Sequence, residues 1–158
     1  MTGVQTCALP IYGGEEFART KGGNNNSFEA PDSVNEVDWG LKRQHLDLFN
    51  YVRDVIALRK AHPMFRLRTT PDVRSRVQFV ETGNPAVLMF TVNGENVSGE
   101  KWRRACVVLN SANDADANIG LPGGEWTVGL DEKGAADGRF VTGRLTVRHK
   151  SGVILYQP

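Results

Sequence analysis

The fold is decided by residues 77–110, VQFVETGNPAVLMFTVNGENVSGEKWRRACVVLN. Three apolar runs in this stretch, residues 77–81, 86–92 and 105–110, have the length of β-strands and are short for helices. The turn residues TGNP separate the first two runs, and Asn93-Gly94 follows the second. Short apolar runs between turns of this kind are typical of antiparallel sheets. The stretch therefore predicts β-structure.

The rest of the C-terminal part continues this pattern. Turn residues again precede apolar runs, as in Pro122-Gly123-Gly124 and Ser151-Gly152. Many short runs with Gly-rich turns between them predict an antiparallel β-sandwich over residues 64–158. The additional runs lie at residues 65–69, 126–130, 145–147 and 153–156.

One amphipathic helix is expected over residues 42–61. Its apolar side chains recur at helical spacing and form one stripe, with polar residues on the far side. Asp47 and Asp54 precede Arg59 and Lys60, an order that suits the helix dipole. Pro63 disfavours helix at His62 and should end the run. The stripe consists of Leu48, Phe49, Val52, Val55 and Ile56.

A strand and a long polar loop are expected before the helix. Residues 11–17 predict a strand, whereas residues 18–38 show neither a helical nor an alternating period. Loops of this length are usually functional or disordered. The adjacent Glu15 and Glu16 invite comparison with the two carboxyl groups of a glycoside hydrolase. Adjacent strand residues point to opposite faces, so this pair is not expected to flank one bond.

Four runs in and after this loop resemble a known family. They are GGEEFARTK at 13–21, NNSF at 25–28, APDSVNEVDW at 30–39 and FNYVRDVIALRKAHPMF at 49–65. They are similar to the corresponding segment of the pullulanases, the type I α-1,6-glucan debranching enzymes of glycoside hydrolase family 13. In that family the segment closes the catalytic (β/α)8 barrel after its eighth strand and leads into the last barrel helix.

The resemblance implies a mainly β chain with a short α/β piece at its N-terminal side. Residues 12–63 would be the end of the barrel, with strand stub, loop and last helix, and residues 64–158 an antiparallel β-sandwich domain. The parent protein would hydrolyse α-1,6 branch linkages in pullulan, glycogen or starch dextrins with retention. The three catalytic carboxylates of the family lie upstream of this segment. The chain itself is thus expected to hold no catalytic residue, to be inactive alone, and to need the missing barrel portion of its own parent chain.

The resemblance also selects candidate sugar-binding residues. In the family the APDSVN segment borders the glucan cleft, which makes Asp32 and Asn35 the first candidates, followed by Arg19 and Asn26. Amide, carboxylate and guanidinium groups match the donors and acceptors of vicinal hydroxyls. The alternative is that these residues form turns and local backbone hydrogen bonds, as Asn and Asp often do.

Composition and motifs exclude other classes of partner. With 19 basic and 18 acidic residues the chain lacks the basic excess expected of a nucleic-acid-binding protein. No apolar run approaches the roughly 20 residues that span a bilayer, so no membrane association is expected. His45, His62 and His149 have no ligand spacing with one another or with Cys106, so neither a metal nor another cofactor is expected.

The first eleven residues, MTGVQTCALPI, resemble a translated DNA-sequencing adapter and are expected to be an artefactual leader. Without them one cysteine remains, Cys106, which we expect to be a buried apolar residue. Because the native N-terminus is expected to be missing, the sequence indicates no cellular location.

Three other functions fit the sequence. In the first, the sandwich is a non-catalytic carbohydrate-binding module that holds a sugar on Trp102 or another exposed ring. In the second, the sandwich is purely structural and covers the apolar stripe of the helix. In the third, the chain is a fragment of a related isoamylase or glycogen-debranching enzyme. Trp39, at the end of the loop, would either anchor the loop or stack on a sugar, and anchoring is favoured.

Overall fold

The computed structural model describes residues 13–136 and 138–158. The expected leader, residues 1–11, lies outside this range. The chain forms two compact units that meet within the longest helix, between Val52 and Arg53. Among the described residues, every helix lies before residue 77 and every strand begins at or after it. The helices are η2 (Glu15–Phe17), α1 (Asp32–Asn35), α2 (Leu41–Gln44), α3 (Leu46–Ala61), η3 (Pro63–Arg66) and α4 (Thr70–Arg76).

The first unit begins with a 3-10 turn where a strand was predicted. Gly14 adopts the left-handed conformation, with φ of 99°, and its carbonyl accepts hydrogen bonds from Phe17 N–H at 3.1 Å and Arg19 N–H at 2.9 Å. A residue other than glycine adopts this backbone conformation only rarely. Residues 15–17 of the predicted strand are thus η2, and residues 11 and 12 of it lie outside the described range. Glu15 and Glu16 are therefore not neighbours on a strand, and the alternation of strand faces does not apply to them.

The predicted helix is present, with one interruption. α2 ends at Gln44, and α3 runs from Leu46 to Ala61. His45 between them leaves the helical region, with φ of −117° and ψ of 45°. Within α3 the prediction of the C-terminal boundary is confirmed, because η3 begins at Pro63.

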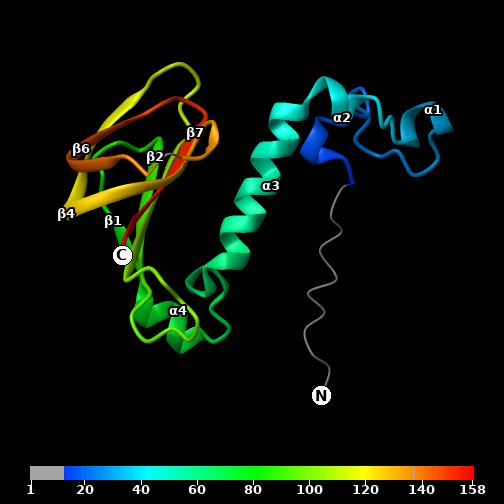
Figure 1. Cartoon of the computed structure of the whole chain (residues 1–158). Coiled ribbons are helices and arrows are strands. Elements are labelled where there is room, and N and C mark those ends of the chain that lie inside the picture. Colours follow the sequence, from blue (N-terminus) through cyan, green and yellow to red (C-terminus); the bar gives the residue numbers. More distant parts are fainter. Residues whose placement is uncertain (1–12, 137) are drawn as a thin grey trace. The chain divides into compact units, whose positions relative to one another are not determined.

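The second unit contains a seven-stranded antiparallel sheet, green to red in Figure 1. The strand order is β1-β2-β3-β7-β4-β5, and β6 pairs with β4. β4 pairs with β6 over residues 117–120 and 125–127 and with β7 over residues 127–130, so one long strand joins two parts of the sheet. The strands are β1 (Val77–Val80), β2 (Val87–Asn93), β3 (Arg104–Asn110), β4 (Ala117–Asp131), β5 (Gly134–Ala135), β6 (Phe140–Val147) and β7 (Ser151–Gln157).

The main hydrophobic core is enclosed by both parts of this sheet, as in a β-sandwich. Its largest member is Trp126, which is fully buried and donates from Nε1 to the carbonyl of Pro122 at 2.8 Å. The mainly antiparallel β fold that was expected is therefore confirmed. The buried side chains come from β2 (Val87, Met89), β3 (Cys106, Val108), β4 (Ala117, Ile119, Trp126, Val128), β6 (Leu145, Val147) and β7 (Val153, Leu155).

A smaller core joins the helix exit to the sheet. Met64 of η3 is buried against Val92 and Ala105, with Trp102 packed at its edge. The close approach requires glycine at position 94, because a Cβ atom there would lie 2.2 Å from the backbone carbonyl oxygen of Trp102 and 2.3 Å from the Met64 methyl carbon. η3 and the loop after β2 are thus fixed to the same end of the sheet.

Two predicted features of the second unit are wrong. Residues 65–69 are not a strand, because they lie in η3 and the link to α4, a helix that was not predicted. Thr69 caps α4: its Oγ1 accepts from Asp72 N–H at 3.2 Å, and Pro71 follows in the first turn. Pro122-Gly123-Gly124 is not a turn between strands but an irregularity inside β4, where the register with β6 shifts.

Candidate functional site

Asn35 organises the polar loop that was singled out from the sequence. Its amide nitrogen donates to the carbonyls of Ser27 and Ala30, both at 2.9 Å, and its Oδ1 accepts from Lys21 Nζ at 2.9 Å. Lys21 also donates to the hydroxyl of Ser27. Both amide donors of Asn35 are therefore used within the loop, and one acceptor position of Oδ1 is used as well.

Arg19 ties the start of the loop to α1. One terminal nitrogen donates to the carbonyl of Gly13 at 3.1 Å, and the other donates to the carbonyl of Asn35. A planar guanidinium with donors in a fixed fork suits such a double attachment. The structure thus brings Arg19 and Asn35 together, as parts of one internal network.

The other two predicted residues are exposed. Asp32 begins α1, where its carbonyl accepts from Glu36 N–H at 2.6 Å and its side chain lies at the surface. Asn26 is also exposed, and its N–H donates to Asn24 Oδ1 at 3.0 Å in a local turn. Their side chains are presented to solvent, whereas that of Asn35 is turned into the loop.

Two aromatic rings of the same unit are exposed. Phe28 has 88% of its surface exposed and Trp39 69%. The Trp39 ring also lies 5.7 Å from the buried ring of Phe17, with an angle of 44° between the planes. Trp39 therefore contacts the loop interior on one side and solvent on the other. Phe28 was not among the candidates selected from the sequence. The signal that could have indicated it is a single aromatic residue in the polar run NNSF.

Trp102 does not offer the exposed platform that the binding-module hypothesis needs. It is half-buried, and its ring stacks on His62 at 3.5 Å and on Tyr156 at 4.3 Å, with interplanar angles of 22° and 6°. Phe65 meets it edge-on at 6.4 Å. A sugar ring would have to displace one of these side chains.

Glu100 and His62 form a buried polar network beside Trp102 that sequence reasoning missed. His62 Nδ1 lies 2.6 Å from Glu100 Oε1, which also accepts from the N–H groups of Lys101 at 2.8 Å and Trp102 at 2.9 Å. Met64 N–H donates to Oε2 at 3.0 Å. Burial acts to raise the pKa of Glu100, but the hydrogen bond from His62 and the three backbone N–H groups outweigh it and lower the pKa.

This network is structural rather than catalytic. Glu100 joins η3 to the loop before β3, and its side chain is only 1% exposed, so solvent and ligands do not reach it. His62 and Glu100 are 38 residues apart in sequence and lie in different predicted elements. No local pattern signals their pairing.

Over residues 13–136 and 138–158, no group of three His, Cys, Asp or Glu side chains is placed to hold a metal ion. Cys106 is buried in the main core, as expected, and burial raises its pKa to about 12. None of the helices described is both long enough and apolar enough to cross a membrane.

The solved structures to which this chain is similar include pullulanases. The pullulanase from Bacillus acidopullulyticus is 35% identical, with a TM-score of 0.82 over 92% of this chain and 18% of that chain. The pullulanase complexed with maltotetraose from Anoxybacillus sp. LM18-11 is 29% identical, with a TM-score of 0.83 over 94% of this chain and 21% of that chain. The chain thus spans about a fifth of the length of these structures.

Comparison of sequences agrees. The pullulanase of Bacillus subtilis (strain 168) is 31% identical over 105 residues, which is 66% of this chain and 14% of that protein. A glycogen debranching enzyme of Yersinia pseudotuberculosis is 26% identical over 139 residues, 80% of this chain and 19% of that protein. A family model described as "Alpha-1,6-glucosidases, pullulanase-type, C-terminal" matches residues 32–151. The chain therefore belongs to the pullulanase-type α-1,6-glucosidases and carries their C-terminal domain.

Proposed function

We propose that this chain is the C-terminal part of a glycoside hydrolase that cleaves α-1,6 branch linkages in α-glucans. The observation that carries the proposal is the family match over residues 32–151, in a chain that spans about a fifth of its relatives. In this proposal residues 12–63 end the catalytic (β/α)8 barrel, and residues 64–158 form the β-sandwich that follows it. Isoamylases and glycogen-debranching enzymes are also among the relatives, so the linkage class rather than one polysaccharide is assigned.

The catalytic carboxylates of the proposed parent would lie on residues outside this chain. Retaining glycoside hydrolysis needs two carboxyl groups about 5–5.5 Å apart, on either side of the scissile bond. Glu16 in η2 is engaged locally, because its Oε2 accepts from Gly14 N–H at 3.1 Å. We therefore expect the chain alone to release no reducing ends from pullulan. Turnover that rises in proportion to the amount of purified chain would overturn this part of the proposal.

The polar loop is proposed to form part of the rim of the glucan cleft. Pullulanases of similar structure have been solved with maltotriose, maltotetraose and maltose, which supports an α-glucan as ligand of the parent. Asp32 is the proposed contact, because its exposed carboxylate can accept from two sugar hydroxyls. Arg19 and Asn35 would hold the loop in place beside the sugar. Asn26 would contribute from the outer edge, and Phe28 offers an exposed ring for stacking.

A chimera tests the role of the loop. Residues 13–158 would replace the corresponding C-terminal part of the pullulanase from Bacillus acidopullulyticus, which is 35% identical. We expect Asp32→Asn to raise KM for pullulan by about tenfold to a hundredfold with little change in kcat, because a lost hydrogen bond to a charged group costs about 1.5–3 kcal/mol. Glu36→Gln, an equally exposed change at the other end of α1, is the matched control. Equal KM values for the two variants would contradict a sugar contact at Asp32.

A further inference from the structure

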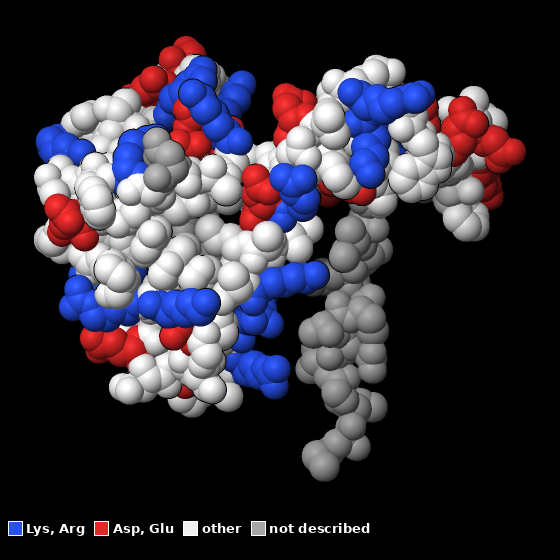
Figure 2. All heavy atoms as spheres, viewed as in Figure 1, with Lys and Arg blue, Asp and Glu red and all other residues white. Residues whose placement is uncertain are grey.

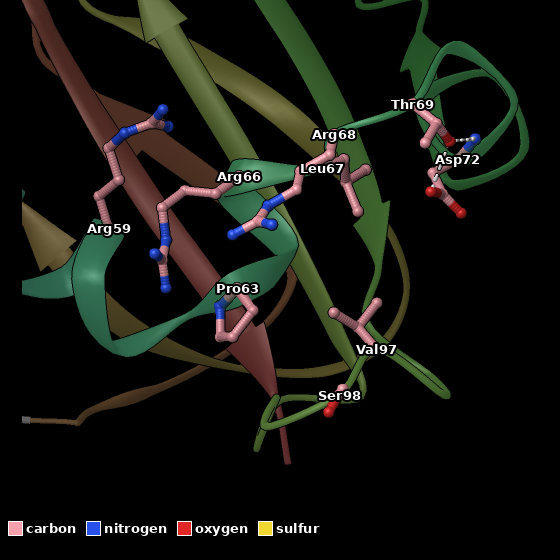
Figure 3. Close-up of a pocket in the computed structure, with 9 residues that line it drawn as sticks. All are labelled: Arg59, Pro63, Arg66, Leu67, Arg68, Thr69, Asp72, Val97 and Ser98. Carbon is pink, nitrogen blue, oxygen red and sulfur yellow. Dashed lines mark hydrogen bonds between the residues drawn. The ribbon is translucent and has the colours of Figure 1, made fainter.

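A pocket with three arginines lies in the second unit, at the helix exit. It has a volume of about 780 Å³ and is bounded by the end of α3, by η3, by the start of α4 and by the loop after β2. Arg59, Arg66 and Arg68 lie on one side of it, and Thr69 and Asp72 lie at the opposite end (Figure 3). It shares no residue with the loop at residues 18–38.

The positive charge around this pocket is concentrated in one stretch of sequence. Residues 59–76, RKAHPMFRLRTTPDVRSR, contain six Arg or Lys and one Asp, whereas the whole chain has a net charge of only +1. In Figure 2, Lys and Arg side chains gather over the lower part of the second unit, where Figure 1 places α4. Such a concentration of positive charge attracts anions.

Two of the arginines are held in place by the backbone. Arg59 Nη1 donates to the carbonyl of Phe65, and Arg66 Nη2 donates to the carbonyl of Lys60 at 3.0 Å. A guanidinium has five N–H donors in a fixed fork, so each side chain keeps further donors for a ligand. Guanidinium forks match the geometry of phosphate oxygens, and an anchored fork loses less conformational freedom when it binds.

The opposite end of the pocket has a different chemistry. Asp72 Oδ2 accepts from the Thr69 hydroxyl at 2.6 Å, so its carboxylate is also held in place. A carboxylate repels an anion but accepts hydrogen bonds from neutral hydroxyls. Pro63 and Leu67 supply an apolar wall between the two ends. The pocket therefore has an anion-binding end, an apolar wall and a hydroxyl-binding end.

We propose that this pocket binds a phosphorylated sugar. The phosphoryl group would lie against Arg59, Arg66 and Arg68, the apolar face of the ring against Pro63 and Leu67, and hydroxyls toward Asp72. The volume falls within the range of about 300–1,000 Å³ that is typical of small-molecule sites. This site is additional to the glucan cleft proposed above, and its occupation does not depend on that proposal.

Calorimetric titration of the full 158-residue chain tests the proposal, with glucose 1-phosphate, inorganic phosphate and glucose as probes. We expect saturable binding of glucose 1-phosphate, weaker binding of inorganic phosphate and weaker binding of glucose. Arg68→Gln should reduce the affinity for glucose 1-phosphate about tenfold or more, because one charge-assisted contact is lost. In the part of the chain that the structure describes, the Arg68 side chain makes no hydrogen bond on which the fold depends. The Arg68→Gln variant should therefore remain folded.

Arg74→Gln removes the same charge from an exposed position of α4 that does not line the pocket. It should leave the affinity for glucose 1-phosphate within about twofold of the original value. Equal losses in Arg68→Gln and Arg74→Gln would show that charge alone attracts the ligand and would overturn the site. Equal affinities for inorganic phosphate and glucose 1-phosphate would overturn its sugar-binding part, and no binding of either would overturn the whole proposal.

Discussion

Replacing Glu100 by Gln should destabilise the second unit strongly, although the side chain keeps its size. The carboxylate is 1% exposed and accepts four hydrogen bonds, from His62 and from the N–H groups of Met64, Lys101 and Trp102. Glutamine has only one side-chain oxygen, and its NH2 group cannot accept. At least one of the four donors is left without a partner.

The expected loss in the free energy of unfolding depends on how the amide of the substituted glutamine is oriented, and the least costly orientation sets its size. Three donors face Oε1 and only Met64 N–H faces Oε2, so the amide nitrogen should take the Oε2 position. An unsatisfied buried donor costs about 1–3 kcal/mol. The three remaining bonds lose their charge assistance, which is roughly half the strength of each. Together we expect the free energy of unfolding to fall by about 2–5 kcal/mol.

Urea unfolding followed by tryptophan fluorescence measures this change, because Trp102 stacks on His62 within the network. Glu95→Gln, an exposed substitution in the same loop, is the matched control and should alter the free energy by no more than about 0.5 kcal/mol. If the two variants unfold at the same urea concentration, the buried network does not contribute in the way the geometry requires.

The remaining predictions concern pH, the thiol, the core and the loop. Because the folded-state pKa of Glu100 lies below its ordinary value of 4.5, its contribution should be complete above pH 4.5 and disappear as the pH falls through the lowered pKa. The difference in melting temperature between the original chain and Glu100→Gln should shrink from pH 5 to pH 3, and a constant difference would contradict this sign. In a chain with Cys7→Ser, Cys106 should resist a thiol reagent at pH 8 until urea is added, since burial raises its pKa to about 12; rapid native labelling would disprove it. Trp126→Phe should cost about 1–3 kcal/mol by removing buried volume and the hydrogen bond to the β4 irregularity, and an unchanged urea midpoint would argue against it. Asn35→Ala should speed amide exchange in residues 19–35 while exchange in the sheet stays the same; equal acceleration in both units would show a global effect instead.

Local patterns were sufficient to predict most of the second unit. The runs at 77–81, 86–92 and 105–110 correspond to β1, β2 and β3 within one or two residues, because apolar period and turn residues act locally. The extent of β4 was not predictable in this way, since its central Pro and Gly residues look like a turn. Only pairing with β6 on both sides of the irregularity keeps that segment in one strand.

Helix signals were also present where they were overlooked. Thr69, Pro71 and Asp72 form a helix start of ordinary kind, with a capping hydroxyl, proline in the first turn and an acidic residue after it. The short apolar run at 65–69 suggested a strand instead. Tertiary packing outweighs this local strand signal, because Met64 and its neighbours form a 3-10 turn that packs against the sheet.

The residue types of the candidate site were selected from the sequence, and their role in sugar binding stays a prediction. Arg19 and Asn35 were selected as sugar-binding groups, yet they meet across sixteen residues of sequence in one loop network. Turn propensity gives no information on such a contact. The partners of Glu100 were hidden for the same reason, since burial and long-range pairing arise only when η3 packs on the sheet.

The DNA upstream of codon 12 in the source genome provides the most direct test of the central claim, that this chain is the C-terminal part of a longer debranching enzyme. We expect an open reading frame that continues upstream in frame, encodes the rest of a (β/α)8 barrel with its catalytic carboxylates, and lacks the codons for residues 1–11. A start codon preceded by an in-frame stop immediately before residue 12, or genomic codons for MTGVQTCALPI themselves, would contradict it.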